Sequence, residues 1–278
     1  MTVRTERLRR ASLDAIPSIS DERARITTTF YKEHLGRHSV PVMRALNFLA
    51  ICDQKTLWMG DGNGGVWSLN LSGTAPNDVI SALQVATTNP QAALNYVGYY
   101  EINGLPYVWA ASQTEVTVFA LSGATSQILW ASDNTSGYRP SGGSLQAVGS
   151  NVVAPLQTNG QISASPAVAN GLLVVPVYVP PNATSCGVGV GYYDLFDLTS
   201  GGTPKINVTY KGNSVASGVI SLGSGIPLSP SLFVSSNGAG FYPYTTSNVP
   251  DPSGNPPPIT PVNLSGSVMN KPIAWRQY

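Results

Sequence analysis

The 278-residue chain carries little charge. Asp, Glu, Lys and Arg make up 10% of its residues, whereas they make up about 25% of an average soluble domain. With a net charge of +1, it has no electrostatic basis for binding nucleic acid, and we expect no such partner. Hydrophobic residues reach 42%, with 13 Tyr and 5 Trp, so the low charge does not indicate disorder. The composition is typical of a neutral extracellular or periplasmic β protein.

Cysteine and histidine are also scarce. Cys52 and Cys186 have no metal-type spacing, and a disulfide between them and two free thiols both remain open. The two histidines, His34 and His38, have the i, i+4 spacing of metal ligands on a helix. Gly36 between them predicts a helix end, which favours surface histidines. We therefore predict no metal site.

No apolar run reaches the about 18 residues that a transmembrane helix needs, so we expect no membrane span. The first ten residues are basic but are not followed by an apolar stretch, and they do not predict a secretory signal. The expected location is therefore extracellular, periplasmic or at the cell surface for the β-rich part. It is the cytoplasm if the N-terminus is the native one.

The charge is distributed unevenly, with a break near Gly60. Residues 1–60 hold 10 of the 15 Lys and Arg and 6 of the 14 Asp and Glu, so their net charge is +10 − 6 = +4. The remaining residues have +5 − 8 = −3. This division predicts two segments of different origin, a helical segment over residues 1–62 and a β domain over residues 63–278.

The first segment predicts two helices. Ser20 is a favourable N-cap, and a helix that follows it would end at Gly36. Pro41 suits the first turn of a second helix, and an apolar stripe follows at i, i+3, i+4, i+7 and i+8. The residues of this stripe are Val42, Ala45, Leu46, Leu49 and Ala50.

This segment resembles the start of the glycyl radical enzymes of the pyruvate formate-lyase-like family. The stretches that carry the resemblance are Arg4–Arg9, Pro17–Ala24, Phe30–Glu33, Arg44–Phe48 and Lys55–Asp61. The family implies a glycyl radical that generates a cysteine thiyl radical. No glycyl radical stretch follows here, and the surroundings of Cys186–Val188 are β-repeat sequence, so we transfer no catalytic residue.

Residues 61–278 read as strands separated by turns. Asn-Gly pairs at 103–104, 159–160, 170–171 and 237–238 are typical of hairpin turns. Alternating, β-branched or aromatic runs predict strands. These runs are 65–69, 96–101, 106–111, 115–121, 171–179 and 192–198.

Three of these lines share an alternating apolar pattern that ends in Leu and then Ser-Gly or Thr-Ser-Gly, at residues 65–73, 116–123 and 191–202. Residues 165–174 and 229–238 repeat a second pattern upstream. A repeat of strand, turn and strand predicts a mainly β, β-propeller-like fold. At about 45 residues per blade, the region accommodates four to five blades, after the short two-helix segment.

The repeat resembles the quinoprotein-like propeller, and more narrowly the C-terminal propeller of type IV pilus tip and assembly proteins. The stretches that carry this resemblance are Cys186–Asp197, Gly223–Pro230 and Ile273–Gln277. It implies protein partners, among them pilus subunits, or a cell surface. The acidic calcium loop of many such proteins is missing, so calcium binding is not implied.

Residues 61–278 contain few candidates for catalytic or metal-binding residues. They include no histidine, and Asp194 and Asp197, three apart on a predicted strand, face opposite sides and are expected to bond loops. The tryptophans 67, 109, 130 and 275 are expected to fill spaces between blades, with a carbohydrate platform as the alternative. Glycosylation sequons occur at Asn70, Asn134, Asn182, Asn207 and Asn263. Residues 250–262 form a Pro-rich surface loop.

These observations favour a non-catalytic module of pilus assembly or surface adhesion, with no catalytic, cofactor-binding or metal-binding residue and no cofactor. An N-terminal fragment of a glycyl radical enzyme joined to unrelated β sequence is the alternative. A relative of the quinoprotein dehydrogenases is a second alternative. Open propeller edges would favour oligomers.

Overall fold

The protein is described here from a computed structural model. This structure describes residues 48–52, 56–70, 81–88, 91–122, 125–135, 137–141, 144–147, 155–182, 187–235, 238–246 and 259–265. In these residues the chain is built of strands alone, and the strands form four antiparallel sheets. The mainly β, propeller-like class predicted from the repeat is therefore confirmed.

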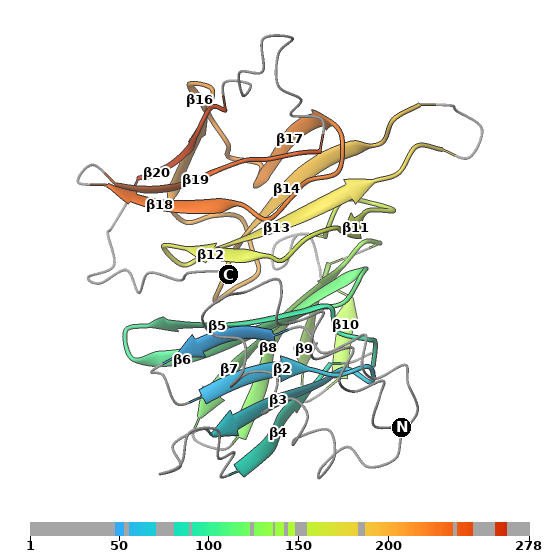
Figure 1. The fold of residues 1–278 in the computed structure, drawn as a ribbon, viewed down its shortest axis with the longest axis vertical. Coiled ribbons are helices and arrows are strands. Elements are labelled where there is room, and N and C mark those ends of the chain that lie inside the picture. Colours follow the sequence, from blue (N-terminus) through green and yellow to red (C-terminus); the bar gives the residue numbers. More distant parts are fainter. Residues whose placement is uncertain are drawn as a thin grey trace, which may run out of the picture.

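The first two sheets are simple meanders, in which each strand pairs with the next along the chain (Figure 1). Sheet A consists of β1 (Phe48–Cys52), β2 (Thr56–Gly60), β3 (Gly65–Asn70) and β4 (Ser81–Thr87). Sheet B consists of β5 (Tyr96–Ile102), β6 (Leu105–Ala111), β7 (Glu115–Ser122), β8 (Thr125–Asp133), β9 (Gly137–Ser141) and β10 (Ser144–Ala147).

The other two sheets share the chain between them. Sheet C consists of β11 (Gln161–Ile162), β12 (Ala167–Ala169), β13 (Leu172–Val179), β14 (Val190–Asp197) and β17 (Val219–Ser224). Sheet D consists of β15 (Asn207–Tyr210), β16 (Asn213–Ser214), β18 (Ser231–Ser235), β19 (Gly238–Tyr242) and β20 (Val262–Ser265). After β14 the chain contributes the β15–β16 hairpin to sheet D, returns to sheet C as β17, and then completes sheet D. This exchange ties the two sheets together.

The four sheets pack face to face in chain order along the long axis of the molecule (Figure 1). One apolar core lies between sheets A and B, a second between B and C, and a third between C and D. Strand β13 contributes side chains to two of these cores. Leu173 and Val175 point into the B–C core, and Leu172 and Val174 point into the C–D core. A sheet that is apolar on both faces is what a propeller blade requires.

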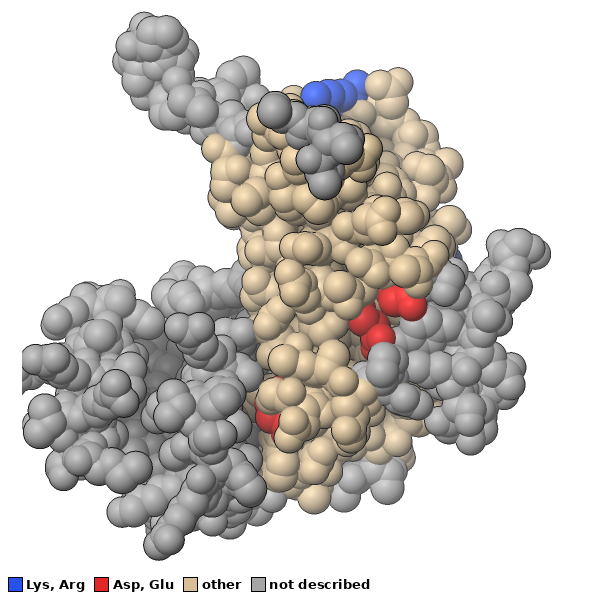
Figure 2. Space-filling model, turned by 90° about the vertical axis from the view of Figure 1, so that its right-hand side faces the viewer, with Lys and Arg blue, Asp and Glu red and all other residues tan. Residues whose placement is uncertain are grey.

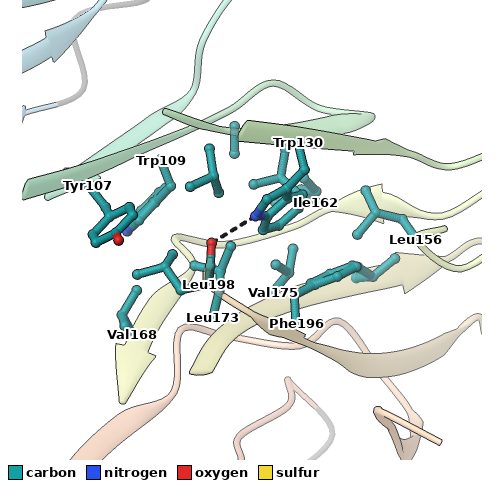
Figure 3. Packing of buried hydrophobic residues seen from close by; sticks show 14 of the residues in the cluster. Tyr107, Trp109, Trp130, Leu156, Ile162, Val168, Leu173, Val175, Phe196 and Leu198 are labelled. Atoms are coloured by element: carbon teal, nitrogen blue, oxygen red, sulfur yellow. Dashed lines mark hydrogen bonds between the residues drawn. The ribbon is translucent and has the colours of Figure 1, made fainter. Parts of the chain in front are cut away.

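The B–C core is built around Trp130 of β8 (Figure 3). Its ring stacks on Phe196 with the centroids 5.3 Å apart, and its indole N–H donates to the carbonyl of Leu198 over 2.8 Å. Burial of a large aromatic side chain and a satisfied indole N–H both stabilise the packing of β8 on β14.

Sheet A includes residues for which the sequence predicted a helix. The apolar stripe extends the second predicted helix to Ala50, but Phe48–Cys52 is strand β1, paired with β2. A short apolar run fits either structure, and cross-strand pairing decides in favour of the strand. The rest of the two-helix segment lies outside the described residues. The β2–β3 hairpin crosses residue 62, so the proposed division at 62–63 falls in its turn.

Hairpins are confirmed at three of the four Asn-Gly pairs, among them the β18–β19 hairpin at 237–238. Asn103-Gly104 joins β5 to β6 and Asn170-Gly171 joins β12 to β13, with positive φ at both residues of each turn. Asn159 also has positive φ, but it lies in a loop before β11. Ser235 pairs with Gly238, so that glycine belongs to β19 rather than to the turn.

Candidate interaction surface

Two glycine-rich segments, which the resemblance to pilus proteins had singled out, come together at one end of sheet C. They are residues 187–191, which lead into the start of β14, and residues 223–228, which comprise the end of β17 and the residues after it. Val190 pairs with Ser224 and Gly191 with Gly223. We call these two segments the glycine-rich rim. Cys186 itself lies outside the described residues.

Close backbone approach explains the glycines of the rim. The N–H of Gly225 donates to the carbonyl of Gly189 over 3.2 Å. A Cβ at Gly191 would lie 2.8 Å from the carbonyl oxygen of Gly225, and one at Gly189 would lie 2.5 Å from that of Val179. Gly225 has a φ of 111°, which L side chains rarely adopt. A side chain at Gly191 would force the two segments apart, and one at Gly189 would force its segment away from β13.

Hydrogen bonds hold the second segment in one conformation. Ile226 donates its N–H to the Thr246 hydroxyl and accepts from the Thr246 N–H, over 3.0 and 2.9 Å. The N–H of Leu228 donates to the carbonyl of Tyr244, and the buried Tyr193 hydroxyl donates to the carbonyl of Leu228 over 2.7 Å. Burial raises the pKa of Tyr193, so this hydroxyl stays a donor. Four hydrogen bonds thus anchor the backbone of Ile226 and Leu228.

The rim exposes three aliphatic side chains. Val188 is 68% exposed, Leu228 43% and Ile226 41%. Ile226 and Leu228 flank Pro227, which is buried and forms a bridge with Thr245, so they alternate outward from one extended segment. An aliphatic surface of this kind gains free energy when a partner covers it, because apolar area leaves water.

Asp194 and Asp197 bind different loops, as expected for blade aspartates. The buried carboxylate of Asp194 accepts from the backbone N–H and the side-chain amide of Gln157, over 2.9 and 3.3 Å. Burial raises the pKa of Asp194 to about 7. The half-buried Asp197 accepts from Thr199, Ser200 and Lys205. Burial alone would raise its pKa, but these hydrogen bonds and the Lys205 charge lower it below the ordinary value.

The described tryptophans serve packing and turn formation rather than an exposed platform. Trp109 and Trp130 are buried in the B–C core. Trp67 is half-buried and donates its indole N–H to Asp61 over 2.8 Å. Trp275 lies outside the described residues. Trp58, which the sequence analysis did not single out, stacks on Tyr99 in the A–B core, with the centroids 5.6 Å apart.

Some of the other residues named from the sequence lie within the described part of the chain, and others do not. His34, His38 and nearly all of the Pro-rich loop lie outside the described residues. Asn182, Asn207 and Asn263 are exposed, whereas the amide of Asn134 donates to the carbonyl of Gly160 over 2.8 Å. The described residues contain no cluster of His, Cys, Asp and Glu that fits a metal ion. They also contain no helix with the length and hydrophobicity to cross a membrane.

Sequence reasoning missed two aspartates that organise turns. Asp61 accepts from the N–H groups of Asn63 and Gly65, and Asp133 accepts from the N–H of Thr135. Both form the side-chain-to-backbone bonds typical of Asx turns. The Asp-Gly-Asn-Gly run at 61–64 could have indicated the first of them.

No family model matches this chain. A stretch of 59 residues, 21% of the chain, is 44% identical to trans-4-hydroxy-L-proline dehydratase of Clostridioides difficile. The chain spans only 8% of that enzyme's length. This match agrees with a resemblance of part of the chain to the glycyl radical enzymes.

Three solved structures are similar to the chain, all at low TM-score and low sequence identity. The computationally designed Ika4 protein has a TM-score of 0.36 at 10% identity, over 82% of this chain and 92% of its own. A bifunctional GH43-CE protein of Bacteroides eggerthii also scores 0.36 at 10% identity, over 84% of this chain and 28% of its own. BamB of Moraxella catarrhalis scores 0.25 at 10% identity, over 79% and 84%.

Proposed function

We propose that the chain is a non-catalytic, β-propeller-like module of surface adhesion or type IV pilus assembly, which binds a protein partner through the glycine-rich rim. The observation that carries this proposal is the meeting of two sequence segments that resemble pilus tip proteins. They form one surface that exposes Val188, Ile226 and Leu228.

The low charge of the part of the chain that the structure describes supports a partner bound by apolar contact. On the face drawn in Figure 2, nearly all of the described residues are uncharged. Acidic side chains form a few small groups there, and basic side chains lie near one end of the molecule. Few surface charges mean weak electrostatic steering, so association would depend on shape and apolar burial.

The test is co-sedimentation of the full-length protein with purified type IV pili. The variant Ile226→Ser/Leu228→Ser should bind at least tenfold more weakly, since it removes two aliphatic contacts and leaves the backbone bonds intact. Leu105→Ser is the matched control, because Leu105 is 59% exposed in sheet B, outside the rim. Equal binding of the rim variant and the wild type would refute the proposal.

The match to trans-4-hydroxy-L-proline dehydratase favours a second candidate, an N-terminal fragment of a glycyl radical enzyme. Such a fragment would need the rest of the enzyme in trans. The test is to mix the full chain with the remainder of that dehydratase and an activating enzyme, and to measure the dehydration of trans-4-hydroxy-L-proline. Dehydratase activity that depends on this chain would support the second candidate, and equal activity with and without the chain would count against it.

A further inference from the structure

The outer face of sheet D, which points away from sheet C, has a composition unlike the three cores. Sheet D is the last sheet of the stack in Figure 1. Strand β20 shows the alternation clearly, because Val262 and Leu264 are buried in the C–D core while Asn263 and Ser265 are exposed. The same alternation holds in β15, where Val208 is buried and Asn207 is exposed.

Cross-strand pairing arranges this outer face into a row that crosses all five strands. Ser214 pairs with Thr209, Thr209 with Asn263, Asn263 with Gly240, and Gly240 with Phe233. Directly paired residues point to the same side of a sheet, and strands lie about 4.8 Å apart. The row therefore runs for about 19 Å and carries hydroxyl and amide groups at one end and an aromatic ring at the other.

The aromatic end of the row is flat because of Gly240. A Cβ at that position would lie 2.5 Å from the ring of Phe233, which shows that the ring lies over the glycine. Tyr242, two residues along β19 on the same side, packs beside it, with the ring centroids 5.0 Å apart and a tilt of 43°. Both rings are half-buried, so each keeps an exposed part.

Two of the glycosylation sequons belong to this face. Asn207 pairs with Ser265, and Thr209 with Asn263, so the sequons at 207–209 and 263–265 lie antiparallel to one another. The i, i+2 spacing of a sequon is also the period of a strand, which places both asparagines and both hydroxyl residues on one side. The strand pattern therefore accounts for these sequons as a cluster of exposed amides and hydroxyls.

We propose that the outer face of sheet D binds a linear, neutral carbohydrate chain. A pyranose ring offers C–H groups that pack on an aromatic face, and hydroxyls that bond to amide and hydroxyl side chains. The face supplies both in one row, and its paired residues 207, 209, 214, 233, 242, 263 and 265 are all uncharged, which matches a neutral ligand. The inference goes beyond the proposed function, because it concerns another surface and another class of ligand.

The test uses the full-length protein, produced without glycosylation, against insoluble cellulose, insoluble chitin, soluble starch and dextran. Wild type should bind at least one of them, and Phe233→Ala and Asn263→Ala should each weaken that binding at least tenfold. Leu232→Ala is the matched control, since Leu232 is the neighbouring residue on β18 and points to the opposite side. Circular dichroism and thermal unfolding establish that each variant is folded.

Two results would overturn the inference. They are wild-type binding to none of the four polysaccharides, or unchanged binding by the folded Asn263→Ala protein. The rim variant Ile226→Ser/Leu228→Ser should bind carbohydrate as wild type does. A failure at the rim and a failure at sheet D can thus be told apart.

Discussion

Asp194 of β14 and Gln157 are joined by two hydrogen bonds that attach the loop before β11 to the middle of sheet C. The same loop contacts sheet B, because the N–H of Leu156 donates to the carbonyl of Asp133 and to the hydroxyl of Ser132, both over 3.0 Å. The buried carboxyl therefore holds together the loop that bridges sheets B and C.

The raised pKa of Asp194 makes stability depend on pH. Its folded value is about 7, against 3.8 as the ordinary value, so the folded state holds the proton more tightly than the unfolded state. Stability from this group is complete below about pH 4 and declines as the pH rises toward 7, by at most about 1.4 kcal/mol per unit. Asp194→Asn should show a smaller loss between pH 5 and pH 8 in urea titrations. An identical loss in both proteins would contradict the assignment.

Trp130 should contribute strongly to stability. Trp130→Phe leaves the buried carbonyl of Leu198 without the indole N–H and creates a small cavity, so we expect a loss of about 2–3 kcal/mol in the free energy of unfolding. Leu105→Ala, at an exposed position, should change it by less than about 0.5 kcal/mol. Chemical denaturation measures both. A loss below 1 kcal/mol for Trp130→Phe would show that this core is packed differently.

Alanine substitutions at two glycines should distinguish the stability cost of backbone strain from the cost of steric crowding. Gly201 has a φ of 68°, and a Cβ there would lie 2.6 Å from the Trp130 ring. Gly212 has a φ of 78° and open space around it. Gly212→Ala should cost about 1–2 kcal/mol, from the left-handed conformation alone. Gly201→Ala should cost clearly more, because it also displaces Trp130. Equal costs, measured by thermal unfolding, would argue against the contact.

The Lys211-Gly212 turn offers a stabilising substitution. It joins β15 to β16 with φ values of 51° and 78°, the conformation for which Asn-Gly is preferred. Lys211→Asn should therefore stabilise the protein by about 0.5 kcal/mol or raise its midpoint of unfolding slightly. Asn103→Lys makes the reverse change in the β5–β6 turn and should lower stability by a similar amount.

The sequence predicts where the strands lie better than it predicts which sheet each strand joins. Period-2 runs and Asn-Gly turns placed β5, β6, β13 and β14 within a residue or two, because strand alternation and turn chemistry are local. The excursion of β15–β16 into sheet D depends on contacts far apart in the chain, which no local pattern encodes. The Lys211-Gly212 turn was missed because lysine is unusual at a positive φ.

The candidate site was predicted only in part. The segments around Gly189 and Gly225 were identified by resemblance, but their meeting depends on the pairing of β14 with β17. The outer face of sheet D was not foreseen, because Phe233 and Asn263 are 30 residues apart and only the register brings them to one row. The burial of Asp194 likewise depends on the loop that covers it.

Site-specific photo-crosslinking would establish whether the glycine-rich rim contacts a filament partner. A photoreactive phenylalanine analogue is placed at Ile226 or, as the control, at Leu105 in the full-length protein, and each protein is irradiated with purified type IV pili. We expect a crosslink to the pilin subunit from position 226 and none from position 105. Crosslinks of equal yield from both positions, or from position 105 alone, would contradict this expectation.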